Sequence, residues 1–166
     1  MAGARVWRRV KPLFQKLLPV KSLPQAVLDR MPLAVALLIL AWAGGLVGWH
    51  GGPDASMAVR LAASLFVAPA LGEELLFRGL VSPRRGPQKR WIAVSTLLFV
   101  LWHPLQALTV GPPWSAAFLD PWFLAAVAVL GIALGRIYAA TGSLWPCVVA
   151  HWLVVFVWKA LLGGPF

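Results

Sequence analysis

The chain has 166 residues, of which 60% are hydrophobic and only 12% are charged, and its mean hydropathy is +0.79. Soluble domains are usually about 45–50% apolar and about 25% charged, and a soluble fold of this size has too little interior to hide so much apolar surface. The composition excludes a disordered or collagen-like chain, and a single cysteine excludes a disulfide scaffold. We therefore expect the lipid bilayer to be the solvent of this chain.

The net charge of +10 is carried by a few short basic segments that lie between long apolar runs. This distribution argues against nucleic-acid binding and is typical of signals that set membrane topology. The first 30 residues hold seven Lys and Arg against one acid, and residues 6–30 have apolar side chains at helical spacing among the basic ones. We expect residues 1–31 to form a basic amphipathic segment on the cytoplasmic membrane surface, with an amphipathic helix within 6–30, and residues 32–166 to form a transmembrane helical domain.

Five apolar runs come close to the roughly 20 residues that a helix needs to cross about 30 Å of hydrocarbon. These runs are 32–49, 58–80, 91–108, 121–139 and 144–162. The basic connection at 84–90 alternates with connections that lack Lys and Arg, at 50–56 and 109–120, which places the N-terminus in the cytoplasm. The sequence thus predicts an all-α fold, a polytopic membrane helix bundle of about five transmembrane helices preceded by an amphipathic interfacial helix.

The densest polar signal inside an apolar run is a pair of adjacent glutamates, Glu73 and Glu74. Two carboxylates in a membrane helix are costly unless they are paired, protonated or open to a cavity. Glu74 and Arg78 lie four residues apart, so an ion pair can form on one helix face. Glu73 points about 100° away and is left to face another group. The alternative is an ordinary charge cluster at the end of a membrane span.

Two histidines lie in other apolar runs. His103 is expected near the bilayer centre, one turn after Phe99, and His151 about 10 Å inside the cytoplasmic end of the fifth run. A buried histidine is more often a packing residue than a catalytic one. Under the topology set by the basic loops, however, Glu73 and the two histidines fall at similar depths. Three separate helices can therefore bring them into one site.

One glutamate and two histidines allow two hydrolytic designs. In the first, Glu73, His103 and His151 bind Zn²⁺, which activates water. In the second there is no metal: Glu73 and one histidine polarise the water, and the other histidine stabilises the developing oxyanion. The metal-free design is favoured, because the common zinc signature of two histidines four residues apart with an adjacent glutamate is absent.

These residues resemble the motifs of the type II CAAX prenyl endopeptidases and bacteriocin-processing enzymes, the CPBP or ABI family of intramembrane proteases. The family pattern begins with Glu-Glu, followed four residues after the second glutamate by Arg, and continues with Phe-x-x-x-His. Glu73, Glu74 and Arg78 match the first motif, and Phe99 and His103 match the second. The resemblance covers residues 58–158.

The third family motif, His-x-x-x-Asn or Asp, is half matched. His151 is followed four residues later by Val155, and the chain contains no asparagine. Val155 cannot donate a hydrogen bond, so either His151 suffices in this role or an indole, that of Trp102 or Trp152, supplies the missing donor.

The resemblance implies roles for these side chains: Glu73 as the base that activates water, His103 as its partner and His151 in the oxyanion site, with Glu74 and Arg78 as a supporting ion pair and Phe99 shaping the same face. It implies an intramembrane endopeptidase of the glutamic type whose transmembrane helical protease domain is residues 32–166, with no cofactor favoured and zinc as the alternative.

The expected partners are the lipid bilayer and a membrane-anchored protein or peptide substrate, held by a lipid or by a C-terminal membrane tail and cleaved near the cytoplasmic interface. Short bacterial members that process C-terminal sorting tails are the most similar subgroup, which suggests an integral protein of the bacterial inner (plasma) membrane.

Other functions compete with proteolysis. Intramembrane glutamate and histidine also build proton or ion relays, although the external half of this chain is almost wholly apolar. Cys147 and His151 have the spacing of a thiol protease pair, but a buried cysteine is usually an inert small hydrophobe. Finally, Val155 favours a catalytically impaired family member that acts as a membrane immunity or scaffold protein.

Overall fold

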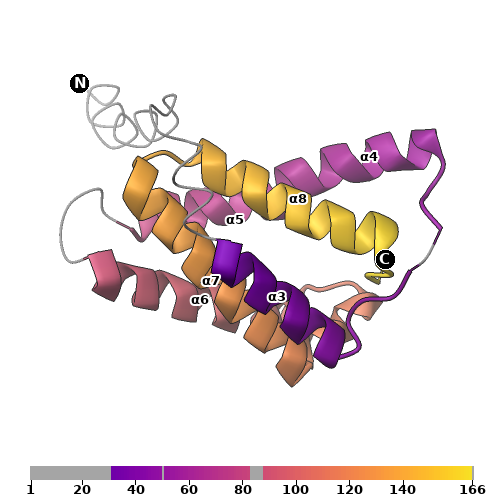
Figure 1. Ribbon diagram of the computed structural model, residues 1–166, viewed down its shortest axis with the longest axis horizontal. Coiled ribbons are helices and arrows are strands. Elements are labelled where there is room, and N and C mark those ends of the chain that lie inside the picture. The colour runs from indigo at the N-terminus through magenta and orange to yellow at the C-terminus, as the bar shows by residue number, and fades with distance from the viewer. Residues whose placement is uncertain (1–30, 50, 83–87, 166) are drawn as a thin grey trace.

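The computed structural model describes residues 31–49, 51–82 and 88–165, and these residues form helices and no strand. The all-α helical bundle predicted from the sequence is confirmed (Figure 1). The amphipathic helix expected before residue 31 lies outside the described residues. The described elements, in chain order, are α3 (Met31–Ala43), α4 (Ala55–Leu65), η1 (Phe66–Leu71), α5 (Gly72–Glu74), η2 (Leu75–Leu80), α6 (Gln88–Thr109), η3 (Pro113–Leu119), α7 (Pro121–Thr141) and α8 (Trp145–Leu161).

The elements from α4 to η2 form one continuous helix, Ala55–Leu80. Its η1 and η2 segments are π-helical, and the single α-helical turn α5 lies between them. The π-helical segment η1 contains Pro69, which has no backbone N–H to continue the α-helical hydrogen bonds. The element η3, in the connection before α7, is a 3₁₀ helix that the sequence did not predict.

Among the described residues, three helices are long and apolar enough to cross a membrane: Ala55–Leu80, Gln88–Thr109 and Pro121–Thr141. Apolar helices also lie in the first and fifth predicted runs, but these are shorter, Pro32–Ala43 and Trp145–Leu161. Each of the five predicted apolar runs thus contains a helix, and three of these helices have the length of a full membrane span.

The first predicted run, 32–49, is wrong in its extent, because the helix ends at Ala43. Two consecutive glycines follow, and Gly45 has a positive φ of 65°. The backbone N–H of Leu46 then donates to the carbonyl of Ala41 at 2.8 Å. A left-handed glycine with such a closing hydrogen bond is a common helix stop, so local turn chemistry overrides the apolar composition that continues to residue 49.

Two aspartates begin the helices that follow the non-basic connections. Oδ1 of Asp54 accepts a hydrogen bond from the backbone N–H of Met57, and Oδ1 of Asp120 accepts from Trp122 and Phe123. The hydrogen bonds from Met57 and the Ser56 hydroxyl hold the pKa of Asp54 below its usual value. Both aspartates therefore act as N-caps that fix where α4 and α7 start.

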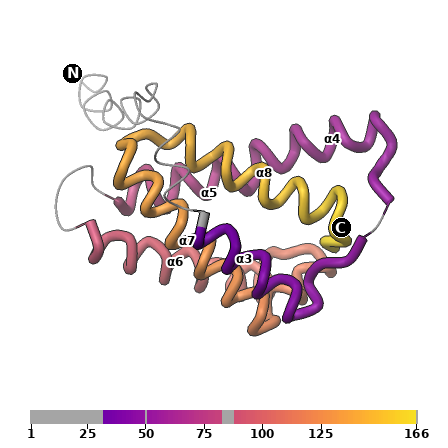
Figure 2. The backbone as a smooth tube through the Cα atoms, viewed as in Figure 1, coloured from indigo at the N-terminus to yellow at the C-terminus, as the bar shows by residue number. Residues whose placement is uncertain are grey.

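The helix α7 is the centre of the bundle and contacts α3, α6 and α8 (Figure 2). Two glycines on α7 permit the close approach of α6. A Cβ atom at Gly131 would lie 2.9 Å from Cγ2 of Thr96 and 3.3 Å from Cδ1 of Phe99, and a Cβ at Gly135 would lie 3.1 Å from Cγ2 of Ile92. The absence of side chains at these two glycines lets α6 pack closely against α7.

Indole N–H groups attach α8 to its neighbours. Nε1 of Trp152 donates to the carbonyl of Ala62 in α4 at 2.8 Å, and Nε1 of Trp158 donates to the carbonyl of Leu46 at 2.7 Å. Each indole thereby satisfies its only hydrogen-bond donor. These bonds fix the position of α8 beside α4 and beside the chain that follows α3.

We expect Gly131→Ala to destabilise the protein by about 1–3 kcal/mol, because the added methyl group forces Thr96 and Phe99 away from α7. Thermal unfolding of the purified protein in detergent micelles measures this change. Gly51→Ala is the control, since nothing lies within 4 Å of a Cβ built at Gly51. An unfolding temperature for Gly131→Ala equal to that of the control would contradict this account of the contact between α6 and α7.

Candidate active site

Glu73 and Glu74 both lie in α5, the α-helical turn between the two π-helical segments. A π-helical turn holds more residues than an α-helical one, and such segments occur often at functional sites. Because neighbouring helix residues point about 100° apart, the two carboxylates have different surroundings. Glu74 is fully buried, whereas the side chain of Glu73 is 12% exposed.

Glu74 forms the buried ion pair expected from the spacing of the sequence. Nη1 of Arg78 lies 2.8 Å from Oε1 of Glu74, and neither side chain is exposed. Nη2 of Arg78 donates to the carbonyl of Gly131 at 3.0 Å, and the guanidinium carbon lies 4.7 Å from the centre of the Phe99 ring. The guanidinium therefore joins the Ala55–Leu80 helix to α7 and α6.

His151 links this ion pair to the other glutamate. Its Nδ1 lies 3.0 Å from Oε1 of Glu74, and its Nε2 lies 3.9 Å from Oε2 of Glu73. A carboxylate oxygen accepts and does not donate, so we assign the Nδ1 proton as the donor in the hydrogen bond to Glu74. That bond orients the ring so that its second nitrogen faces Glu73.

Glu73 has a hydrogen-bond partner at only one of its two carboxylate oxygens among the described residues. Nε1 of Trp102 donates to Oε1 of Glu73 at 3.1 Å. Oε2 of Glu73 is buried and has no hydrogen-bond partner within the described part of the chain. The side chain lines a cavity of about 630 Å³, which is also lined by both histidines. Trp102 thus satisfies one carboxylate oxygen, and the other keeps its hydrogen-bonding capacity.

His103 lines the same cavity from α6. Its Nδ1 lies 2.8 Å from the carbonyl oxygen of Phe99, which can only accept, so the neutral ring carries its proton on Nδ1 and has an acceptor at Nε2. The Phe99 ring lies edge-on to both histidines, 5.0 Å from His103 and 5.6 Å from His151. No hydrogen bond or ion pair joins His103 to Glu73 in the described ranges.

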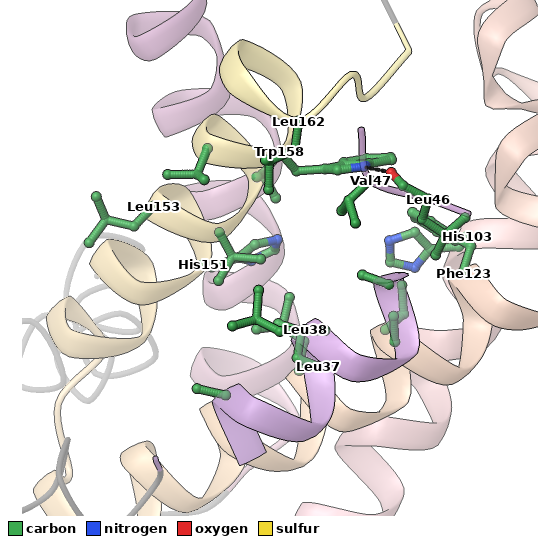
Figure 3. A pocket seen from close by; sticks show the side chains of 18 of the residues that line it. Leu37, Leu38, Leu46, Val47, His103, Phe123, His151, Leu153, Trp158 and Leu162 are labelled. Atoms are coloured by element: carbon green, nitrogen blue, oxygen red, sulfur yellow. Dashed lines mark hydrogen bonds between the residues drawn. The ribbon is translucent and has the colours of Figure 1, made fainter. Parts of the chain in front are cut away.

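A second cavity, of about 360 Å³, adjoins these histidines and is lined mostly by apolar side chains of α3, α7 and α8. His103 and His151 face it from opposite sides, with Leu37 and Leu38 of α3 on another wall (Figure 3). The two cavities share lining residues, namely His103, Phe123, His151, Val155 and Trp158. The apolar cavity therefore adjoins the cavity that Glu73 and the two histidines line.

Of the residues predicted from the sequence, Glu73, Phe99, His103 and His151 line these cavities, whereas Glu74 and Arg78 are fully buried and line neither. Phe99 contacts both histidines and the guanidinium, and Glu73, His103 and His151 line one cavity together. In the described ranges, no group of three His, Cys, Asp or Glu is arranged to hold a metal ion, so we derive no step through zinc.

Sequence reasoning missed two features of the site. Trp102 is the partner of Glu73, whereas the sequence suggested it only as an oxyanion donor, and the sole signal was its position next to His103. Phe118 of η3 lies 5.1 Å from the His103 ring, in a segment interpreted as an external connection. The other suggested donor, Trp152, is bonded to the carbonyl of Ala62.

We expect Arg78→Met to destabilise the protein by about 3–5 kcal/mol, because Glu74 would remain buried without its cation. Removing both charges in the double variant Glu74→Leu, Arg78→Met should restore much of this loss. Thermal unfolding in micelles measures both, with Arg60→Met on the exposed face of α4 as a control. A double variant as unstable as Arg78→Met would show that the guanidinium acts through its other contacts.

Comparison with known proteins identifies the family of this chain. The sequence model of the family described as type II CAAX prenyl endopeptidase Rce1-like matches residues 54–157. No curated protein and no solved structure matches the chain. The match includes the glutamate pair, both histidines and the three helices that could cross a membrane. The chain belongs to the type II CAAX prenyl endopeptidase Rce1-like family, a family of membrane-embedded proteases.

Proposed function

We propose that this protein is an intramembrane endopeptidase in which Glu73 activates the water that hydrolyses the peptide bond. The substrate is a lipid-anchored protein, or one held by a C-terminal membrane tail, cleaved near the cytoplasmic interface of a bacterial inner membrane. One observation carries the proposal: Glu73, whose Oε2 has no hydrogen-bond partner in the described residues, lines a cavity together with His103 and His151. Family membership supports the same reaction class.

In the proposed reaction, a water beside Oε2 of Glu73 transfers a proton to the carboxylate as its oxygen bonds to the scissile carbonyl carbon. The carbon–nitrogen bond then breaks, and Glu73 returns the proton to the leaving amine. The hydrogen bond from Trp102 to Oε1 keeps the carboxylate in one orientation through both steps. The reaction consumes one water, yields an acid and an amine, and leaves Glu73 in its starting form.

The two histidines have different hydrogen-bond states, which suit different roles. With Nδ1 bonded to the Phe99 carbonyl, neutral His103 presents an acceptor at Nε2 that can polarise the water together with Glu73. His151 is bonded to Glu74 through Nδ1, and when protonated it donates from Nε2 to the oxyanion. We therefore assign His103 as the partner of Glu73 and His151 to the oxyanion site.

The apolar cavity supports a substrate with a hydrocarbon anchor. Its walls from α3, α7 and α8 consist mainly of Leu, Val and Ala side chains, and the two histidines lie at its edge. Burial of hydrocarbon there is favourable, at about 25 cal/mol per Å² of apolar surface. An anchor in this cavity holds the adjacent peptide next to Glu73.

A catalytically impaired member that serves as an immunity or scaffold protein is the second candidate, because of Val155. This side chain lines both cavities and has no hydrogen-bond donor. The indoles of Trp102 and Trp152 donate to other groups in this conformation. A zinc-dependent form of the same protease is the third candidate.

We expect Glu73→Gln to abolish cleavage of a membrane-anchored substrate, because an amide cannot take the proton of water, and His103→Ala to lower kcat by about 10²–10⁴-fold. Purified protein in proteoliposomes, with cleavage followed on gels, measures both effects. Cleavage that a chelator leaves unchanged supports the glutamic form, and loss on chelation with recovery on adding Zn²⁺ supports the zinc form. Undiminished cleavage by Glu73→Gln would refute the assignment of the base.

We expect Val155→Asn to raise kcat by about tenfold or more, since the amide adds a donor beside His151 and single oxyanion donors have large effects. Val155→Ile is the matched control, because it changes size without adding a donor. If cleavage appears only in Val155→Asn, the natural protein is the impaired form. If Val155→Asn and Val155→Ile have the same kcat, the missing donor does not limit the reaction.

A further inference from the structure

The wall of the cavity that Glu73 and the two histidines line includes a glutamine that the proposed hydrolysis does not use. Gln106 lies in the last turn of α6 and lines this cavity of about 630 Å³. It is half-buried, in a helix that is long and apolar enough to cross a membrane. Polar side chains in membrane helices are costly, and they usually face a cavity or the bundle interior and take part in function.

The backbone of Gln106 is hydrogen-bonded, whereas its side chain is not. The backbone carbonyl accepts from the N–H groups of Val110 and Gly111 at 3.2 and 2.7 Å. In the described ranges, no hydrogen bond joins the carboxamide to another group. A carboxamide has two N–H donors and one carbonyl oxygen, and leaving such groups unpaired away from water is costly. The side chain of Gln106 therefore keeps its full hydrogen-bonding capacity.

Helix geometry directs Gln106 towards the groups assigned to the reaction. It lies four residues after Trp102, whose indole donates to Glu73, and three residues after His103. Residues three and four apart share a helix face, and the Cα–Cβ bond of a helical residue tilts towards the helix N-terminus. Gln106 therefore leans over the turn that carries Trp102 and His103, and these three residues line the same cavity.

The hydroxyl and indole donors that line this cavity are mostly engaged. The hydroxyl of Ser64 and the indoles of Trp102 and Trp158 all donate to other groups of the protein. The indole of Trp114 has no hydrogen-bond partner among the described residues, but Trp114 lies in η3, outside the helices that carry the reacting groups. Gln106 is therefore the donor best placed to reach a peptide beside Glu73.

We propose that Gln106 is a catalytic residue whose N–H donates to the scissile carbonyl oxygen as this oxygen becomes an oxyanion, so that it supplies a donor that Val155 lacks. This inference rests on the proposed function. When the water oxygen bonds to the carbonyl carbon, one electron pair of the C=O bond moves to the oxygen, and hydrogen bonds from Gln106 and His151 stabilise that charge. The electron pair returns as the carbon–nitrogen bond breaks, so Gln106 loses no proton.

The end of α6 holds this donor in a fixed place. Its last turn is closed by the two backbone hydrogen bonds to Gln106, and a Cβ atom at Gly111 would lie only 2.7 Å from the same carbonyl oxygen. Donors that are held in place before the reaction stabilise the transition state without a cost of reorganisation. A neutral amide also stabilises the oxyanion without protonating Glu73.

Binding on the Glu73→Gln background tests the donor without turnover. The probe is a fluorophore-labelled peptide that ends in S-farnesyl-cysteine, valine, isoleucine and methionine, with either the natural amide or a tetrahedral, anionic phosphinate after the cysteine. Adding Gln106→Met should weaken phosphinate binding about tenfold and amide binding by less than about twofold in fluorescence anisotropy. Equal changes for the two peptides, as packing alone would cause, would overturn the inference.

Turnover of the amide peptide in proteoliposomes is the second test, with Glu73 intact. Gln106→Met should lower kcat about 10²-fold and change KM by less than about threefold, because the bond forms only in the transition state. Leu105→Met is the matched control, since Leu105 is the preceding residue and is 52% exposed. A kcat for Gln106→Met equal to that of this control would also overturn the inference.

A further variant separates the two unpaired donors of the cavity. Trp114→Phe removes the indole N–H and should keep kcat within about twofold of the natural value. If Trp114→Phe lowers kcat about 10²-fold and Gln106→Met does not, the donor is the indole and the inference is wrong.

The same measurements distinguish this inference from the proposed function. Cleavage that is lost in Glu73→Gln but unchanged in Gln106→Met refutes only the role of Gln106. Phosphinate-selective binding that depends on Gln106, without cleavage of the amide peptide by the natural protein, refutes only the hydrolysis.

Discussion

The buried ion pair between Glu74 and Arg78 is the interaction on which the site depends. Two charges removed from water are stable only when their remaining hydrogen-bond capacity is satisfied. Here the guanidinium bonds to the Gly131 carbonyl and lies over Phe99, and the carboxylate also accepts from His151. This ion pair therefore holds three helices together and orients the ring of His151. The geometry around Glu73 depends on it, because Glu73 is next to Glu74 in the chain.

The two adjacent glutamates have different surroundings. Glu74 has both its cation and a histidine, and it is closed to solvent. Glu73 accepts a hydrogen bond from an indole at one oxygen, and its side chain lines a cavity. The π-helical segments η1 and η2 on either side fix this division, since they set the rotation of α5 relative to the rest of the helix. A helix without them would present the same residues in other directions.

The membrane fold and the pairing of Glu74 with Arg78 were predictable from local sequence, because apolar run length and a four-residue spacing are local properties. The end of the first helix was not, since the turn at Gly45 stops it within an apolar run. The contact between Glu73 and Trp102 and the position of Phe118 depend on how separate helices pack. The roles of Glu73, His103 and His151 remain predictions, which the proposed variants test.

The early end of α3 has a consequence for the surrounding lipid. Its 13 described residues span about 20 Å, against about 30 Å for the hydrocarbon of a bilayer. Hydrophobic mismatch of this kind is relieved when the bilayer thins locally or when headgroups move inward. Because α3 forms a wall of the apolar cavity beside both histidines, such thinning brings interfacial water towards the place where a peptide bond would be hydrolysed.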